Sequence, residues 1–225
     1  MGDGKVSITL GSAPAAEDVI LDCDDHLYCG TRHGEIVRFF APDYVKSEVF
    51  AHIGGFPLGL AFDKTGNLIS CVGAMGLYSV SPQREVKRLT AETARSWTSI
   101  VDDARLRDPN DCDIAPDGRI YFTDSTKRYD AHDWALDSIE NRATGRLLVY
   151  DPRDGSTKTL LDGYRYTNGV CMAHTERQNA QHRHGSDDSD EVVGVDEAWQ
   201  ADGSGNEQHH RDGKDNAFLI QAPEI

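Results

Sequence analysis

The stretch that decides the fold is DIAPDGRIYFTDST (Asp113–Thr126), which continues through GRLLVYDP (Gly145–Pro152) to YTNGV (Tyr166–Val170). Short runs of aliphatic and aromatic residues alternate here with Asp, Gly and Pro. Gly accepts the positive φ of tight turns and Asp hydrogen-bonds to the nearby backbone, so this alternation is typical of antiparallel strands joined by hairpin turns. The stretch therefore predicts a β-meander.

The same pattern occurs three times along the chain. Each copy has an apolar strand, an acidic turn, a second apolar strand and a third strand that ends in a charged hairpin. The copies span Val19–Phe39, Leu58–Val80 and Cys112–Tyr150, and Thr167–Met172 begins a fourth. Repeats of roughly 40 to 45 residues with several strands each are typical of β-propeller blades. An insertion at Tyr129–Asn141 interrupts the third copy, and we expect it to cover one end of the propeller.

From Asp113 to Asn168 the sequence closely resembles the conserved core of the strictosidine-synthase-like family, whose relatives include the gluconolactonases and paraoxonases. The resemblance implies an all-β, six-bladed propeller that is usually hydrolytic and holds a metal on its central axis. It ends abruptly after His174. Since a complete six-bladed propeller needs ~240 residues or more, we expect an incomplete one of about three and a half blades within residues 15–174, preceded by an N-terminal segment, 1–14.

The composition changes after His174. Residues 175–225 are acidic and rich in His, Gln and Gly, with almost no apolar periodicity, so we expect this tail to be disordered. One hypothesis is a shift of reading frame after His174, which resequencing of the DNA across that codon would test. A truncated chain and a chain completed by a partner are the alternatives.

Three residues each directly precede the inner strand of a blade: Glu17, Asn110 and Asn168. Because inner strands surround the central tunnel of a propeller, residues at their starts converge on one point. The order Glu, Asn, Asn matches the ligands that the resemblance implies for a calcium site of lactonase or phosphotriesterase type. The family's fourth, acidic ligand comes from a later blade and has no counterpart here. Carboxylate and amide oxygens suit Ca²⁺ or another divalent cation. The alternative is that the two Asn are ordinary turn residues and Glu17 a solvated carboxylate.

Two aspartates directly follow proposed ligands, Asp18 after Glu17 and Asp111 after Asn110. The resemblance to paraoxonase-like proteins implies that such pairs hold a second, structural calcium. The alternative, which we favour, is that both aspartates cap turns.

The overall charge limits the classes of partner that the protein is expected to bind. A net charge of -15 and a pI near 4.9 argue against nucleic-acid binding, which normally needs a clustered basic surface. The sequence has no apolar run of the ~20 residues that span a bilayer, and Met1–Pro14 lacks the pattern of a secretory signal. We expect a cytoplasmic protein with a small-molecule partner, and the sequence does not indicate an oligomeric state.

The function that the resemblance favours is a metal-dependent hydrolase of lactones or esters, impaired if the propeller is incomplete. No nucleophile elbow, phosphate-binding Gly loop or zinc-protease motif occurs, so no catalytic residue is identified. One alternative is a metal-free condensing enzyme of strictosidine-synthase type, a C–N lyase that uses a carboxylate from a later blade. The other is a non-catalytic propeller fragment or the inactive product of a damaged gene.

Overall fold

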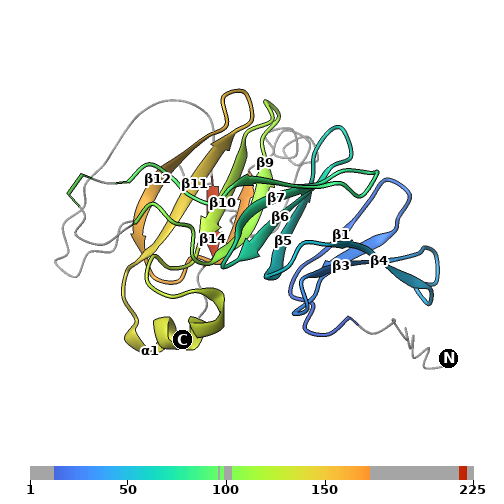
Figure 1. Ribbon diagram of the computed structural model, residues 1–225, viewed down its shortest axis with the longest axis horizontal. Helices are drawn as coiled ribbons and strands as arrows, with labels where there is room; N and C mark the ends of the chain where they lie inside the picture. The colour runs from blue at the N-terminus through green and yellow to red at the C-terminus, as the bar shows by residue number, and fades with distance from the viewer. Residues whose placement is uncertain (1–12, 96, 99–102, 173–217, 222–225) are drawn as a thin grey trace, which may run out of the picture.

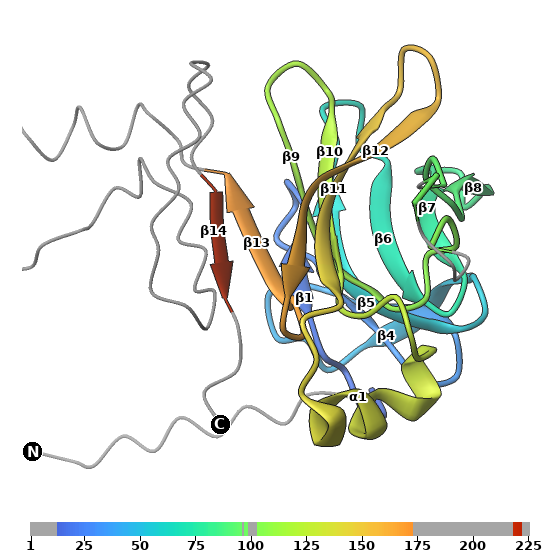
Figure 2. The same ribbon diagram turned by 90° about the vertical axis from the view of Figure 1, so that its left-hand side faces the viewer.

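The computed structural model describes residues 13–95, 97–98, 103–172 and 218–221. Its strands form three four-stranded antiparallel sheets and one two-stranded sheet, and each four-stranded sheet joins its strands in chain order. Figures 1 and 2 show the three larger sheets following one another in space like the blades of a propeller. The predicted all-β fold of propeller type is confirmed, with three full blades and the start of a fourth.

Each blade runs from its inner strand to its outer strand. The first contains β1 (Val19–Leu21), β2 (Leu27–Gly30), β3 (Glu35–Phe39) and β4 (Ser47–His52); the second contains β5 (Phe56–Phe62), β6 (Leu68–Gly73), β7 (Gly76–Val80) and β8 (Val86–Thr90); the third contains β9 (Pro109–Ile114), β10 (Ile120–Asp124), β11 (Gly145–Asp151) and β12 (Ser156–Tyr164). The fourth sheet pairs β13 (Gly169–Met172) with β14 (Phe218–Gln221).

The acidic turns form as their composition predicts. Between β5 and β6, Oδ1 of Asp63 accepts hydrogen bonds from the backbone N–H groups of Thr65 at 2.8 Å and Asn67 at 2.9 Å. Gly66 in the same turn has φ of +82°, which an L-residue adopts only with strain. A local side-chain acceptor and a positive φ thus reverse the chain within a few residues, which sets the register of the hairpin.

The apolar cores lie between successive blades. Side chains of the first and second blades pack together in one cluster, and those of the second and third blades pack in another. The largest fully buried members are Ile36, Leu68, Val72 and Val80 in the first cluster, and Leu77, Leu106, Phe122 and Leu148 in the second. Burying each such side chain stabilises the fold by roughly 1.5–3 kcal/mol, so each blade depends on its neighbours for its stability.

The insertion within the third blade folds into a short 3₁₀ turn, η1 (Ala131–Asp133), and the helix α1 (Trp134–Glu140). Both lie at one end of the sheets (Figure 2). A Cβ atom added to Gly73, the last residue of β6, would come within 2.6 Å of the Ala131 Cβ, so the insertion rests on the end of the second blade. None of the described residues belongs to a helix of the length and hydropathy that would span a membrane.

Part of the predicted tail differs from the expectation of disorder. Residues Phe218–Gln221 form β14, which pairs antiparallel with β13 from Gly169↔Gln221 to Met172↔Phe218. Their sequence, FLIQ, is the apolar exception in a polar tail and supplies the kind of residues that strands prefer. Residues 175–217 and 222–225, the rest of that tail, lie outside the described residues, as do residues 1–12.

A buried ion pair joins β10 to β11. Arg146 on β11 is 2% exposed and donates to Oδ2 of Asp124 from Nη2 at 2.8 Å and from Nε at 3.0 Å. The same guanidinium donates to the backbone carbonyls of Asp103 at 2.5 Å and Arg105 at 2.8 Å. The pair therefore ties the segment that precedes β9 to the middle of the third blade.

We expect Arg146→Met to be strongly destabilising, because it leaves Asp124 buried without its counter-charge. Breaking a buried pair from one side typically costs about 3–5 kcal/mol. Urea denaturation would measure the change in the free energy of unfolding. The matched control is Arg153→Met, which breaks the pair of Arg153 with Asp151, where the arginine is exposed, and is expected to change little. Equal losses in the two variants would contradict a special role for the buried pair.

Candidate functional site

The start of β9 carries two buried side chains with unsatisfied oxygens. Asn110 is 5% exposed and Asp108, just before the strand, is 1% exposed. Oδ1 of each has no hydrogen-bond partner within the described part of the chain. Buried polar atoms are nearly always hydrogen-bonded, and alternate residues of an extended segment face the same side. Two orphaned oxygens on one side of one strand therefore indicate a site for a ligand that the protein itself does not supply.

The ion pair of the third blade fixes this segment in place. Oδ1 of Asp124 accepts hydrogen bonds from the backbone N–H groups of Asp108 at 2.7 Å and Arg107 at 3.2 Å. Because Asp124 is itself held by Arg146, the backbone at the start of β9 has a rigid anchor.

A second set of hydrogen bonds links the backbone of Asn168 to that of Asp111, the residue after Asn110. Thr123 Oγ1 on β10 accepts from the backbone N–H of Asp111 at 3.1 Å and donates to the backbone carbonyl of Asn168 at 2.6 Å. Asn110 and Asn168 therefore begin neighbouring inner strands, β9 and β13, at the same end of the propeller. The structure thus places both residues at the starts of inner strands, and the convergence of their side chains on one point stays a prediction.

Glu17 approaches the same region from the first blade. The residue is exposed, yet partial desolvation raises the pKa of its carboxyl, and the charges of Asp18 and Asp111 raise it further. The charge of Glu17 in turn raises the pKa of Asp108. Glu17 is thus electrostatically coupled to the start of β9, although it comes from a different blade.

The potential at this site is strongly negative. Burial, followed by the charges of Asp124 and Asp137, raises the pKa of Asp108 to about 7, even though a hydrogen bond with the Tyr166 phenol opposes the shift. Burial also raises the pKa of Tyr166, and the charge of Asp108 contributes to that rise. Oxygen donors in a negative potential fit a hard divalent cation, so the residues present are suited to the group that the sequence predicts.

No cluster of three or more His, Cys, Asp or Glu side chains suited to a metal ion occurs within the described ranges. The predicted set is of a different kind, because two of its three ligands are Asn. The assignment of Glu17, Asn110 and Asn168 as ligands stays a prediction.

Asp18 and Asp111 connect successive inner strands. Oδ2 of Asp18 accepts from the backbone N–H of Leu60 on β5 at 2.8 Å, and Oδ2 of Asp111 accepts from the N–H of Val170 on β13 at 2.8 Å. Between them, a Cβ on Gly59 would lie 2.4 Å from the Asp111 Cα, so only glycine fits there. The corresponding residue of β13 is also glycine, so the four inner strands carry Asp18, Gly59, Asp111 and Gly169 in turn. These contacts give Asp18 and Asp111 a structural role that does not depend on a second calcium. The second calcium itself stays a prediction.

We expect Asp111→Ala to destabilise the protein equally with and without calcium, because it removes the acceptor for the N–H groups of Cys112 and Val170, both at 2.8 Å. Leaving a buried donor unpaired costs about 1–3 kcal/mol. Thermal or urea unfolding in chelator and in CaCl₂ would measure the loss, with Asp117→Ala in an exposed turn as the control. A loss confined to the calcium-containing sample would instead favour the second-calcium role.

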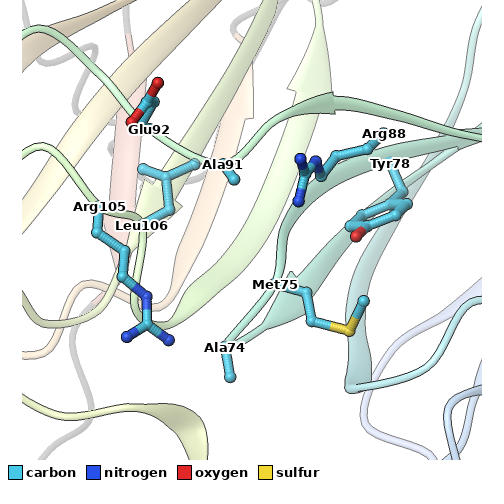
Figure 3. Close-up of a pocket in the computed structure, with 8 residues that line it drawn as sticks. All are labelled: Ala74, Met75, Tyr78, Arg88, Ala91, Glu92, Arg105 and Leu106. Atoms are coloured by element: carbon cyan, nitrogen blue, oxygen red, sulfur yellow. The ribbon is translucent and has the colours of Figure 1, made fainter.

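A surface pocket of ≈ 410 Å³ lies away from the inner strands. Its lining residues come from β7, β8 and the segments that follow β6 and β8: Ala74, Met75, Tyr78, Arg88, Ala91, Glu92, Arg105 and Leu106. Figure 3 shows Arg88 and Arg105 on opposite sides of it. Arg105 also pairs with Asp130 of the insertion at 3.1 Å. The pocket contains none of the predicted ligands, so its volume says nothing about the site at the start of β9.

Two residues that stand close to the predicted ligands, Asp108 and Tyr166, were not identified from the sequence. Each stands two residues before a predicted ligand, Asn110 and Asn168 respectively. The spacing Asp-x-Asn at Asp108–Asn110 is a usable signal, because alternate residues supply oxygen ligands in calcium loops. The burial of Asp108 could not be predicted from the sequence, because it depends on Gly73 and on the insertion.

Comparisons with known proteins match the region that contains Asn110 and Asn168. The family profile described as strictosidine synthase matches residues 110–178. Protein STRICTOSIDINE SYNTHASE-LIKE 6 of Arabidopsis thaliana is 29% identical over 174 residues, which cover 76% of this chain and 45% of that protein. The adipocyte plasma membrane-associated protein of Homo sapiens is 32% identical over 165 residues, which cover 68% of this chain and 38% of that protein. The chain thus spans less than half the length of these relatives.

Among solved structures, a gluconolactonase of Xanthomonas campestris superimposes with a TM-score of 0.54 at 19% identity, covering 71% of this chain and 51% of that one. At this identity the likeness concerns the fold, and it agrees with the propeller arrangement of the blades.

Proposed function

The chain belongs to the strictosidine-synthase-like family, and from that premise we propose that it binds a divalent cation, Ca²⁺ by preference, through Glu17, Asn110 and Asn168 and serves the hydrolysis of a lactone or ester. The observation that carries the proposal is the buried Oδ1 of Asn110, which has no partner in the described part of the chain. It lies at the start of an inner strand, where the sequence predicts a ligand.

The residue types support this chemistry. A bound divalent cation polarises a carbonyl oxygen and stabilises the negative charge that develops on it during hydrolysis. Asn110 and Asn168 would contribute neutral amide oxygens and Glu17 a carboxylate, a set of the kind that calcium prefers.

The surroundings of the ligands favour an organic substrate. The second blade has Leu58, 4% exposed, at the position that Glu17 and Asn110 occupy in their blades. The Leu58 Cδ1 lies 3.6 Å from where a Cβ on Gly73 would be, beneath the insertion. On the proposed function, this buried Leu58 would be the apolar residue of the inner-strand starts, which would favour an organic substrate.

We expect calcium to bind the 225-residue chain and to stabilise it. A ligand that binds only the folded state adds about 2.7 kcal/mol of stability at 100 times its dissociation constant. Isothermal titration and thermal unfolding after chelator treatment would measure binding and stabilisation, with the double variant Asn110→Ala/Asn168→Ala as the comparison. Binding that is unchanged in the double variant would remove the assigned ligands from the proposal.

Hydrolysis should depend on the same cation. We expect turnover of a panel of lactones and aryl esters to disappear in excess EDTA and to return on adding CaCl₂. The metal-free condensing activity that strictosidine synthase suggests would survive EDTA and produce a C–N bond instead. Titration of released acid distinguishes the two, because only hydrolysis liberates a carboxylic acid. Lactone turnover that persists undiminished in EDTA would rule out the metal-dependent mechanism.

A further inference from the structure

Asp108 is the one acidic side chain at the start of β9 whose second oxygen is unused. It is 1% exposed, and Oδ1 has no partner among the residues that the structure describes. The Tyr166 phenol hydrogen-bonds to the same carboxyl, which leaves Oδ1 as the free atom. The other acidic residues of this region, Asp111 and Asp124, already accept hydrogen bonds through both oxygens.

The residues around Oδ1 of Asp108 have small side chains. A Cβ added to Gly73 would lie 3.3 Å from it, and the same Cβ would touch Ala131 of the insertion. The guanidinium of Arg146, which holds Asp124, donates to that carboxylate and to two backbone carbonyls. Burying a charged oxygen without a partner is costly, so a bound cation would relieve it.

We propose that Asp108 supplies an anionic oxygen to the cation site of Glu17, Asn110 and Asn168, in place of the acidic ligand that the family takes from a later blade. This inference rests on the proposed function. Asp108 and Asn110 stand at alternate positions and both present an orphaned, buried Oδ1. Calcium loops use the same alternate spacing to direct several oxygens at one ion.

Charge balance favours this assignment. Glu17 and the two Asn offer a single negative charge to a dication, whereas Glu17 with Asp108 offers two. The charge of Glu17 already acts on Asp108 across the gap between the first and third blades. A cation between the two carboxylates would turn this repulsion into attraction to a common centre, with water completing the six to eight ligands that calcium takes.

The test is calcium binding by isothermal titration to the chelator-treated 225-residue chain. Asp108→Asn keeps the shape of the side chain and an acceptor for Tyr166 but removes the charge, and we expect it to weaken binding at least tenfold. Asn110→Ala should weaken it likewise. The control Asp117→Asn removes one charge from an exposed turn of the same blade and should leave the affinity within about twofold.

Unfolding in urea with EDTA present gives a second readout. A buried ligand carboxylate destabilises the folded protein when no cation is bound. The Asp108→Asn variant should therefore unfold at the same or a higher urea concentration than the original chain. A carboxylate with only a structural role would show the reverse, because its removal would lower the midpoint.

Terbium luminescence tests the location independently of folding defects in the Asp108 variant. Tb³⁺ replaces Ca²⁺ at oxygen sites and is excited through nearby tyrosines, so Tyr166→Phe should reduce the Ca²⁺-displaceable emission. Calcium affinity retained in Asp108→Asn but lost in Asn110→Ala would overturn the role of Asp108 and leave the proposed function standing. Absence of calcium binding by the original chain would overturn both.

Discussion

The ion pair between Asp124 and Arg146 is the interaction on which the rest of the site depends. Through its Oδ1, Asp124 holds the backbone at Asp108, and its own carbonyl accepts from Thr167 Oγ1 at 3.0 Å. Thr167 immediately precedes Asn168, so one carboxylate and its backbone position the starts of both β9 and β13. A charge placed fully inside the protein is tolerated because it is paired and hydrogen-bonded on every side, and it gives a rigid reference point to residues from separate strands.

This arrangement separates two uses of acidic residues on the same strands. Asp111 and Asp18 direct their oxygens at backbone N–H groups of the next inner strand and hold blades together. Asp108 and Asn110 each have an Oδ1 that meets no donor among the residues that the structure describes. Neighbouring residues of an extended strand point in opposite directions, so structure and binding are assigned to alternate positions of one segment. The negative potential that results is unfavourable for the empty protein and favourable for a cation.

The blades were predictable from sequence because their signals are local. The Asp63 turn, for example, is specified by residues within five positions of one another, and the apolar strands that flank it follow the alternation rule. The placement of Asn110 and Asn168 at the starts of β9 and β13 was predictable for the same reason, since each occupies the same place in its repeat. Asp108 was not, because its burial is produced by Gly73 and Ala131, which belong to other parts of the chain. The pairing of β14 with β13 was missed because four apolar residues in a polar tail carry little weight by themselves.

The alternation of Asp18, Gly59 and Asp111 on successive inner strands has a consequence for the spacing of these strands. A Cβ at Gly59 would collide with the backbone of Asp111 on the next inner strand, so these two strands approach more closely than a side chain would allow. On its other side the Gly59 strand receives the Asp18 carboxylate, which accepts from the backbone N–H of Leu60. Close backbone contact on one side and a carboxylate bridge on the other thus set two different separations within the first three inner strands.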